Sequence, residues 1–204
     1  MYKSPFKVVP DFLSPLMCEE IVDELGFESP DTNIDGNAIK SMKHHEQFEA
    51  MVFERLEHII PALEQHYGFI YKGTEKMEFE WVPEGASIDP HCESAEYISG
   101  NWVKTRYRDF TCVIFLTDFN DDPPFDDDFE VFGGKLEFPS HQFGFNPQRG
   151  TMVIYPSDPR FANATAKAIV GDLHQIRIHI AAEEPYAYDP KQFPGNYTVW
   201  FNDL

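Results

Sequence analysis

From residue 76 onward the sequence consists of short apolar or alternating stretches separated by proline and glycine, and this pattern most constrains the fold. Residues 77–82 and 173–180 alternate between apolar and polar side chains, as strands with one buried face do. Residues 111–116 and 150–155 are largely apolar runs, as strands buried on both faces are. Several short strands after a helical start predict a mainly β chain, a sandwich or barrel with helices packed on one side.

The N-terminal part predicts two helices. Over residues 11–26, Ser14 is suited to the N-cap, Pro15 to the first helical position and Gly26 to the end. A second helix is predicted over residues 39–67, and Pro61 within it should kink or split it. Its expected buried stripe is Phe48, Val52, Leu56, Ile59, Leu63 and Tyr67.

Length and composition favour one globular domain. The 204 residues are 42% hydrophobic and 15% aromatic, which suits a packed core rather than a disordered chain. We expect a single domain over residues 1–204. It would have a helical part at 1–75, a β core at 76–183 and a C-terminal extension at 184–204.

Charge and cysteine content exclude some classes of partner. The net charge of −19 argues against a nucleic acid or a membrane surface as partner, because both require clustered cations. Lys104, Arg106 and Arg108 form the one local basic group that stands out. The three cysteines form no metal-binding pattern, and the polar start carries no apolar run. We therefore expect a cytoplasmic protein with no signal peptide and no transmembrane segment, and the sequence leaves its oligomeric state open.

His91 and Glu93 are the first candidate metal ligands. On a strand, residues two apart point to the same face, so this imidazole and carboxylate would project together. Such a pair supplies two of the three ligands of a non-haem Fe(II) facial triad. The alternative is a surface pair without a site.

Several spaced blocks together resemble the prolyl 4-hydroxylase type of 2-oxoglutarate/Fe(II) oxygenase, especially the small forms of bacteria and phages. Residues 12–14, Phe-Leu-Ser before a helix bearing cysteine, are similar to the lead-in of that family. The spacing from Gly85 to His91 is similar to its glycine-to-metal-motif spacing. Residues 108–116, 133–138 and 150–157 resemble the blocks that follow. The resemblance implies a double-stranded β-helix, or jelly roll, with N-terminal helices on one side.

The sequence departs from the family pattern at three places. Glu93 stands where the family usually has aspartate, and Val82 where relatives often have a tyrosine that touches 2-oxoglutarate. No histidine lies between Tyr155 and Gly171, where the distal ligand belongs.

Two alignments of that last stretch are open. Anchoring on Gly171 puts Asn163 in the ligand position and Leu173 in the position of the basic residue. Anchoring on Arg177 puts Lys167 or its neighbours in the ligand position. We take Asn163 as the third candidate ligand, a weak one because its amide oxygen is neutral. The alternatives are His174, His179 or solvent. As strand residues five apart, these two histidines should face opposite sides, with His179 on the face of Arg177.

Two arginines require partners. Arg177 lies in an apolar strand, where an unpaired charge would be costly. The resemblance implies that it binds the carboxylate of 2-oxoglutarate, and a carboxylate of the protein is the other option. For Arg108 we expect an internal salt bridge with Asp109 or with the acidic segment at 118–130.

The function that the resemblance implies is an Fe(II)- and 2-oxoglutarate-dependent dioxygenase, a hydroxylase. Its metal ligands would be His91, Glu93 and Asn163, and Arg177 would hold the co-substrate. Ascorbate is an additional cofactor of such enzymes, and a peptide or an amino acid is the implied substrate. The other interpretation is a jelly-roll binding protein without a functional iron site, which the missing distal histidine favours.

Overall fold

The computed structural model describes residues 3–26, 39–41, 46–125 and 127–193. Two helices and many antiparallel strands make it a mainly β structure. The large sheet has the order β1 (Lys7–Val9), β13 (Met152–Pro156), β8 (Phe110–Phe115), β16 (Leu173–Ala182), β4 (Glu78–Val82) and β2 (Ile39–Ser41), and β3 (Tyr71–Thr74) also pairs with β16.

The opposite layer consists of shorter sheets. One has the order β12 (Phe143–Phe145), β11 (Leu136–Phe138), β14 (Asn163–Thr165) and β5 (Ile88–His91). Another has the order β15 (Ala168–Val170), β10 (Glu130–Gly133) and β9 (Asp118–Phe119). A separate hairpin joins β6 (Ala95–Ile98) to β7 (Asn101–Lys104), and two short 3-10 helices span Pro139–His141 and Pro159–Phe161.

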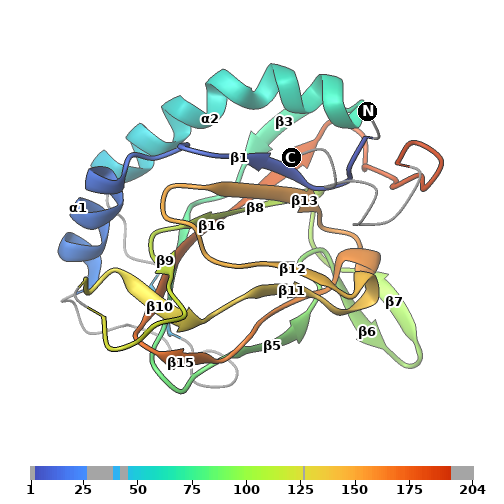
Figure 1. The fold of residues 1–204 in the computed structure, drawn as a ribbon. Coiled ribbons are helices and arrows are strands. Elements are labelled where there is room, and N and C mark those ends of the chain that lie inside the picture. The colour runs from blue at the N-terminus through green and yellow to red at the C-terminus, as the bar shows by residue number, and fades with distance from the viewer. Residues whose placement is uncertain (1–2, 27–38, 42–45, 126, 194–204) are drawn as a thin grey trace.

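The helices α1 (Pro15–Gly26) and α2 (Glu46–Tyr67) lie over the large sheet, as Figure 1 shows at the top of the molecule. Ile176, Ile178 and Ile180 of β16 pack in one core cluster with apolar residues of both helices. A second cluster, which includes Val113 and Phe115 of β8, lies between the sheets. Strand β8 is therefore buried on both faces, as its apolar sequence predicts.

The first helix is confirmed. Helix α1 begins at Pro15, and the hydroxyl of Ser14 accepts a hydrogen bond from the backbone N–H of Met17 at 3.3 Å. That contact satisfies one of the N–H groups that the first helical turn leaves without a partner. The predicted strands at 77–82, 111–116, 150–155 and 173–180 correspond to β4, β8, β13 and β16.

The prediction for the second helix was wrong about where it begins and about a split at Pro61, one of the two effects expected there. Residues 39–41 form strand β2, which pairs with β4, and the helix begins only at Glu46. Residues 42–45 lie outside the described part. Nor does Pro61 split the helix, which continues to Tyr67. Pro61 and Glu57, whose carbonyl loses its helical hydrogen bond to the proline, are both exposed, so water can satisfy that carbonyl.

The alternation of β16 determines what fills the space between the sheets. Its isoleucines pack with the helices, so Gln175, Arg177 and His179 point the other way, and all three are buried. None of the helices in the described residues has the length and apolarity that a membrane crossing needs.

Candidate functional site

Strand pairing brings the candidate metal ligands together from distant parts of the sequence. Asn163, at the start of β14, lies directly opposite His91, at the end of β5. Glu93 follows two residues later, and its carboxylate Oε1 lies 2.8 Å from Nε2 of His91. The structure thus places Asn163, the candidate from the alignment anchored on Gly171, beside His91. Leu173, which takes the position of the basic residue in that alignment, is fully buried. Lys167, from the other alignment, is exposed.

Arg177 reaches the same place from the large sheet. Its Nη1 lies 2.5 Å from Oε1 of Glu93, 3.2 Å from Oδ1 of Asn163 and 3.3 Å from the hydroxyl of Tyr155. Its Nε donates to Oε1 of Glu80 at 3.1 Å. The carboxylate partners of Arg177 in the structure are therefore those of the protein, the second of the two options left open by the sequence.

These contacts fix the charge states of the pair. Burial disfavours the charged form of Arg177, but the Glu80 and Glu93 carboxylates outweigh burial and hold its pKa well above the usual value. Burial alone would raise the pKa of Glu93. The charge of Arg177 and the hydrogen bond with His91 outweigh this effect of burial, so the pKa of Glu93 lies well below its usual value. Glu93 is thus an ionised carboxylate beside the Arg177 guanidinium.

The second oxygen of Glu93 also faces basic groups. Nη1 of Arg108 lies 3.4 Å from Oε2, and Nε2 of His179 lies 3.6 Å from it. Burial lowers the pKa of His179 to about 4, so this imidazole is neutral near pH 7. Both oxygens of the best candidate carboxylate are therefore already engaged by the protein.

The prediction for Arg108 was wrong about its partner. Arg108 pairs with Glu75 at 2.6 Å, with Glu78 at 3.1 Å and with Glu93, while Asp109 pairs with Lys104. Arg108 is buried at the end of the polar cluster, where it faces carboxylates from the loop before β4 and from β4 itself.

The side chains in this arrangement do not fit an Fe(II) ion. Nδ1 of His91 lies 2.9 Å from the carbonyl oxygen of Asp89 and Nε2 lies 2.8 Å from Oε1 of Glu93, so both ring nitrogens already face oxygen atoms of the protein. The amide oxygen of Asn163 accepts from Arg177. Within the described ranges, no group of three histidine, cysteine, aspartate or glutamate side chains is placed to hold a metal ion.

Two buried donors beside this cluster have no hydrogen-bond partner among the residues that the structure describes. They are Nη2 of Arg177 and Nδ2 of Asn163. A buried donor without an acceptor costs free energy, so an acceptor oxygen beside these two donors would be stabilising.

Sequence reasoning missed Glu78, Glu80 and Tyr155. The alternation of β4 does carry a pattern that could have identified the two glutamates. Phe79 and Trp81 pack with the helix-side core, so Glu78 and Glu80 must face the space between the sheets, beside β16. The predicted orientation of the two histidines of β16 is confirmed, because His174 stacks on Trp81 while His179 faces Glu93.

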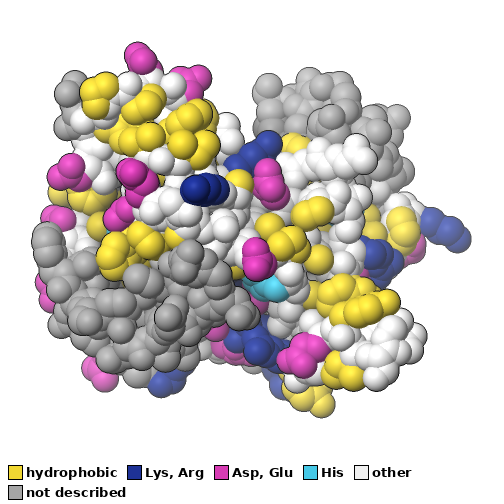
Figure 2. Space-filling model, turned by 90° about the horizontal axis from the view of Figure 1, so that it is seen from below, with side chains coloured by type: hydrophobic (Ala, Val, Ile, Leu, Met, Phe, Trp, Pro, Cys, Tyr) yellow, Lys and Arg dark blue, Asp and Glu magenta, His cyan; other side chains and the backbone are white. Residues whose placement is uncertain are grey.

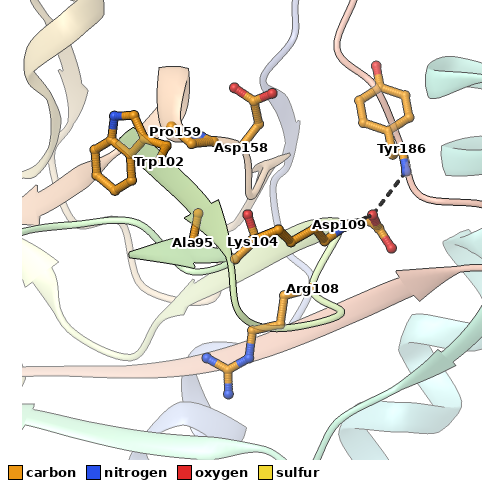
Figure 3. Close-up of a pocket in the computed structure, with 9 residues that line it drawn as sticks. Ala95, Trp102, Lys104, Arg108, Asp109, Asp158, Pro159 and Tyr186 are labelled. Atoms are coloured by element: carbon orange, nitrogen blue, oxygen red, sulfur yellow. Dashed lines mark hydrogen bonds and ion pairs between the residues drawn. The ribbon is translucent and has the colours of Figure 1, made fainter. Parts of the chain in front are cut away.

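A pocket of about 190 Å³ adjoins this cluster on its outer side. Figure 3 shows it between Trp102 and Lys104 of the β6–β7 hairpin, the Asp158–Pro159 turn and Tyr186. Arg108 also lines it and connects it to Glu93.

The hairpin beside the pocket exposes large apolar side chains. The exposed fraction is 64% for Tyr97, 46% for Ile98, 46% for Trp102 and 44% for Val103. Figure 2, which views the molecule from below, shows hydrophobic side chains next to lysine and arginine on the side where Figure 1 places β6 and β7. Tyr97 and Trp102 lie directly opposite each other and share one face of the hairpin, while Ile98 and Val103 lie on the other face. Exposed aromatic surface such as the Tyr97–Trp102 pair is typical of an interaction site.

Comparison with known proteins gives similarity in structure only. No family model and no curated protein sequence matches the chain. Among solved structures, a viral collagen prolyl hydroxylase from Paramecium Bursaria Chlorella virus-1, in its 2-oxoglutarate complex, aligns with a TM-score of 0.66 at 14% identity, covering 89% of this chain and 97% of the other. A Pseudomonas putida prolyl-4-hydroxylase aligns with a TM-score of 0.63 at 15% identity over 89% and 94% of the two chains.

A third structure is a prolyl hydroxylase from Trichoplax adhaerens in complex with a hypoxia inducible factor oxygen degradation domain peptide fragment. It aligns with a TM-score of 0.62 at 12% identity over 88% of this chain and 84% of the other. At such identities the likeness establishes the fold and not the activity. This chain has the fold of the prolyl 4-hydroxylases.

Proposed function

We propose that this protein is a peptide-binding protein built on the double-stranded β-helix of the 2-oxoglutarate oxygenases, without a functional iron centre. The observation that carries the proposal is the exposed apolar hairpin beside a pocket, next to a buried centre in which Arg177 already engages Glu93. The peptide complex of the Trichoplax protein supports a peptide as ligand.

The hairpin is suited to an extended peptide for two reasons. Strands β6 and β7 pair only with each other in the described sheets, so their outer edges offer backbone hydrogen-bonding groups to a further strand. Trp102 and Tyr97, with ring centres 5.4 Å apart, offer aromatic surface at low cost in conformational entropy. The pocket is large enough for one side chain of such a peptide.

The proposal predicts that Trp102 dominates the affinity. A peptide would first be selected against the wild-type protein from a displayed library of random peptides. Trp102→Ala should then weaken its binding about 30-fold or more, because aromatic anchors at the centre of an interface typically contribute 2 kcal/mol or more. Fluorescence anisotropy of the labelled peptide measures the change.

The matched control is Ile169→Ala, since Ile169 is also an exposed apolar strand residue, at 51%, but lies on β15. It should bind the peptide as the wild type does. Failure to enrich any peptide, or equal affinity for the Trp102→Ala and wild-type proteins, would contradict the proposal.

The second candidate function is an Fe(II)- and 2-oxoglutarate-dependent hydroxylase. It is favoured by the pairing of Asn163 with His91 beside Glu93, and by the unused buried donors of Arg177 and Asn163. In this case Arg177 would have to leave Glu93, which would then be free to bind iron with His91, and iron would supply oxygen activation. Formation of succinate from 2-oxoglutarate that is lost in His91→Ala would favour this candidate over the first.

A further inference from the structure

Arg177 lies among the three side chains that were predicted to hold a metal ion. We infer that its guanidinium is a resident cation that replaces a divalent metal ion at this position and holds the two layers of sheet together. The inference rests on the contacts of Arg177 and is independent of the peptide-binding proposal.

The Arg177 guanidinium lies where the three candidate ligands meet. Nη1 of Arg177 contacts the carboxylate of Glu93 and the amide oxygen of Asn163, and His91 contacts the same oxygen of Glu93. One nitrogen atom of Arg177 thus meets two of the candidate ligands directly and shares an oxygen with the third. A metal ion bound by those side chains would compete with Nη1 for the same oxygens.

The positive charge of Arg177 lies between two buried carboxylates. Arg177 is fully buried, and its carboxylate partners Glu80 and Glu93 have side chains that are only 1% and 3% exposed. Buried carboxylates need a cation nearby, and a guanidinium can contact two of them at once through different nitrogens. Without Arg177, a divalent ion with two positive charges would compensate the same pair of carboxylates.

The Arg177 side chain connects the two layers of sheet. Arg177 lies in the middle of the large sheet, opposite Val113 of β8 and Glu78 of β4. Its side chain crosses the interior to Asn163, on β14 of the opposite layer. Only a long side chain can make this crossing, and a metal ion held between the layers would connect them in the same way.

The test is to remove the guanidinium and supply a metal ion in its place. Arg177→Ala leaves room for a hydrated ion, and Co²⁺ is the probe because it resists air oxidation and absorbs visible light when bound by protein ligands. We expect the thermal midpoint of Arg177→Ala to lie below that of the wild type and to rise by about 5–10 °C at Co²⁺ concentrations 100-fold above its dissociation constant. The wild-type midpoint should not change with Co²⁺.

Two further variants keep the test decisive. If Arg177→Ala does not fold alone, adding Glu80→Gln removes one of the two buried negative charges that contact Arg177, and the double variant is refolded with and without Co²⁺. Adding His91→Ala to either variant should abolish the gain, which separates this site from adventitious metal binding at the surface. The inference is overturned if neither Arg177 variant gains a His91-dependent stabilisation, or if the wild type already shows one.

Discussion

Replacing Arg177 with methionine should lower the free energy of unfolding by about 3–5 kcal/mol, because it removes the guanidinium that contacts two buried carboxylates. Methionine keeps much of the apolar volume of the side chain, so the loss reports mainly the missing charge. Glu80 and Glu93, both almost fully buried, would lose their partner. Urea denaturation followed by circular dichroism measures the difference.

The matched control is Arg160→Met. Arg160 also pairs with an aspartate, Asp158 at 2.5 Å, but its side chain is 50% exposed, so its loss should cost no more than about 1 kcal/mol. A second comparison adds Glu93→Gln to Arg177→Met. This addition should cost at least about 1 kcal/mol less than Glu93→Gln costs in the wild type, since the contact between Arg177 and Glu93 is already absent, while the contacts of Glu93 with Arg108 and His91 are the same in both backgrounds. Equal costs for the two arginine substitutions would rule out the buried network as a major source of stability.

Acid should destabilise the fold between pH 6.5 and 4 through two buried histidines. Burial lowers the pKa of both His174 and His179 from 6.5 to about 4. Within this window the unfolded chain binds protons that the folded chain does not, so stability falls as pH falls, and it is fully present above 6.5. By pH 4.5 the loss should be about 2–3 kcal/mol for each histidine. The pKa of Glu93 is depressed, so its contribution is lost only at lower pH.

His174→Phe isolates one of these contributions. His174 stacks between Phe79 and Trp81, so phenylalanine keeps a ring in the stack and removes the titration. The variant should lose about 2–3 kcal/mol less than the wild type between pH 7 and 4.5 in denaturant titrations. His58→Gln, on the exposed side of α2, should follow the wild type. A His174→Phe variant as acid-sensitive as the wild type would show that this burial does not govern the pH dependence.

Local patterns predicted the strands that form the core of the large sheet. The alternation of β16 and β4 and the apolar run of β8 depend only on which faces are buried, and neighbouring residues carry that information. The start of the second helix was mistaken because pairing with β4 draws residues 39–41 into a strand, and such pairing is a tertiary effect that a local apolar pattern does not reveal.

Four side chains of the cluster could be named from the sequence, but their contacts could not. His91, Glu93, Asn163 and Arg177 do meet, which follows from the strand register. Arg177 pairs with Glu80, 97 positions away along the chain, and with Glu93, 84 positions away. Local patterning therefore left open whether its carboxylate partner was a ligand or the protein. The contacts of Arg177 with Glu80 and Glu93 depend on the reach of its side chain across the interior, which only the packed structure shows.

Arg177 occupies the position between Glu93, Asn163 and His91 at which a metal ion would bind. The most direct measurement adds Fe(II) and 2-oxoglutarate anaerobically to the wild-type protein, records the visible charge-transfer absorption of the chelate, and determines iron per chain after gel filtration. We predict no such band and no iron that depends on His91. A band accompanied by one iron per chain, both lost in His91→Ala, would contradict the claim.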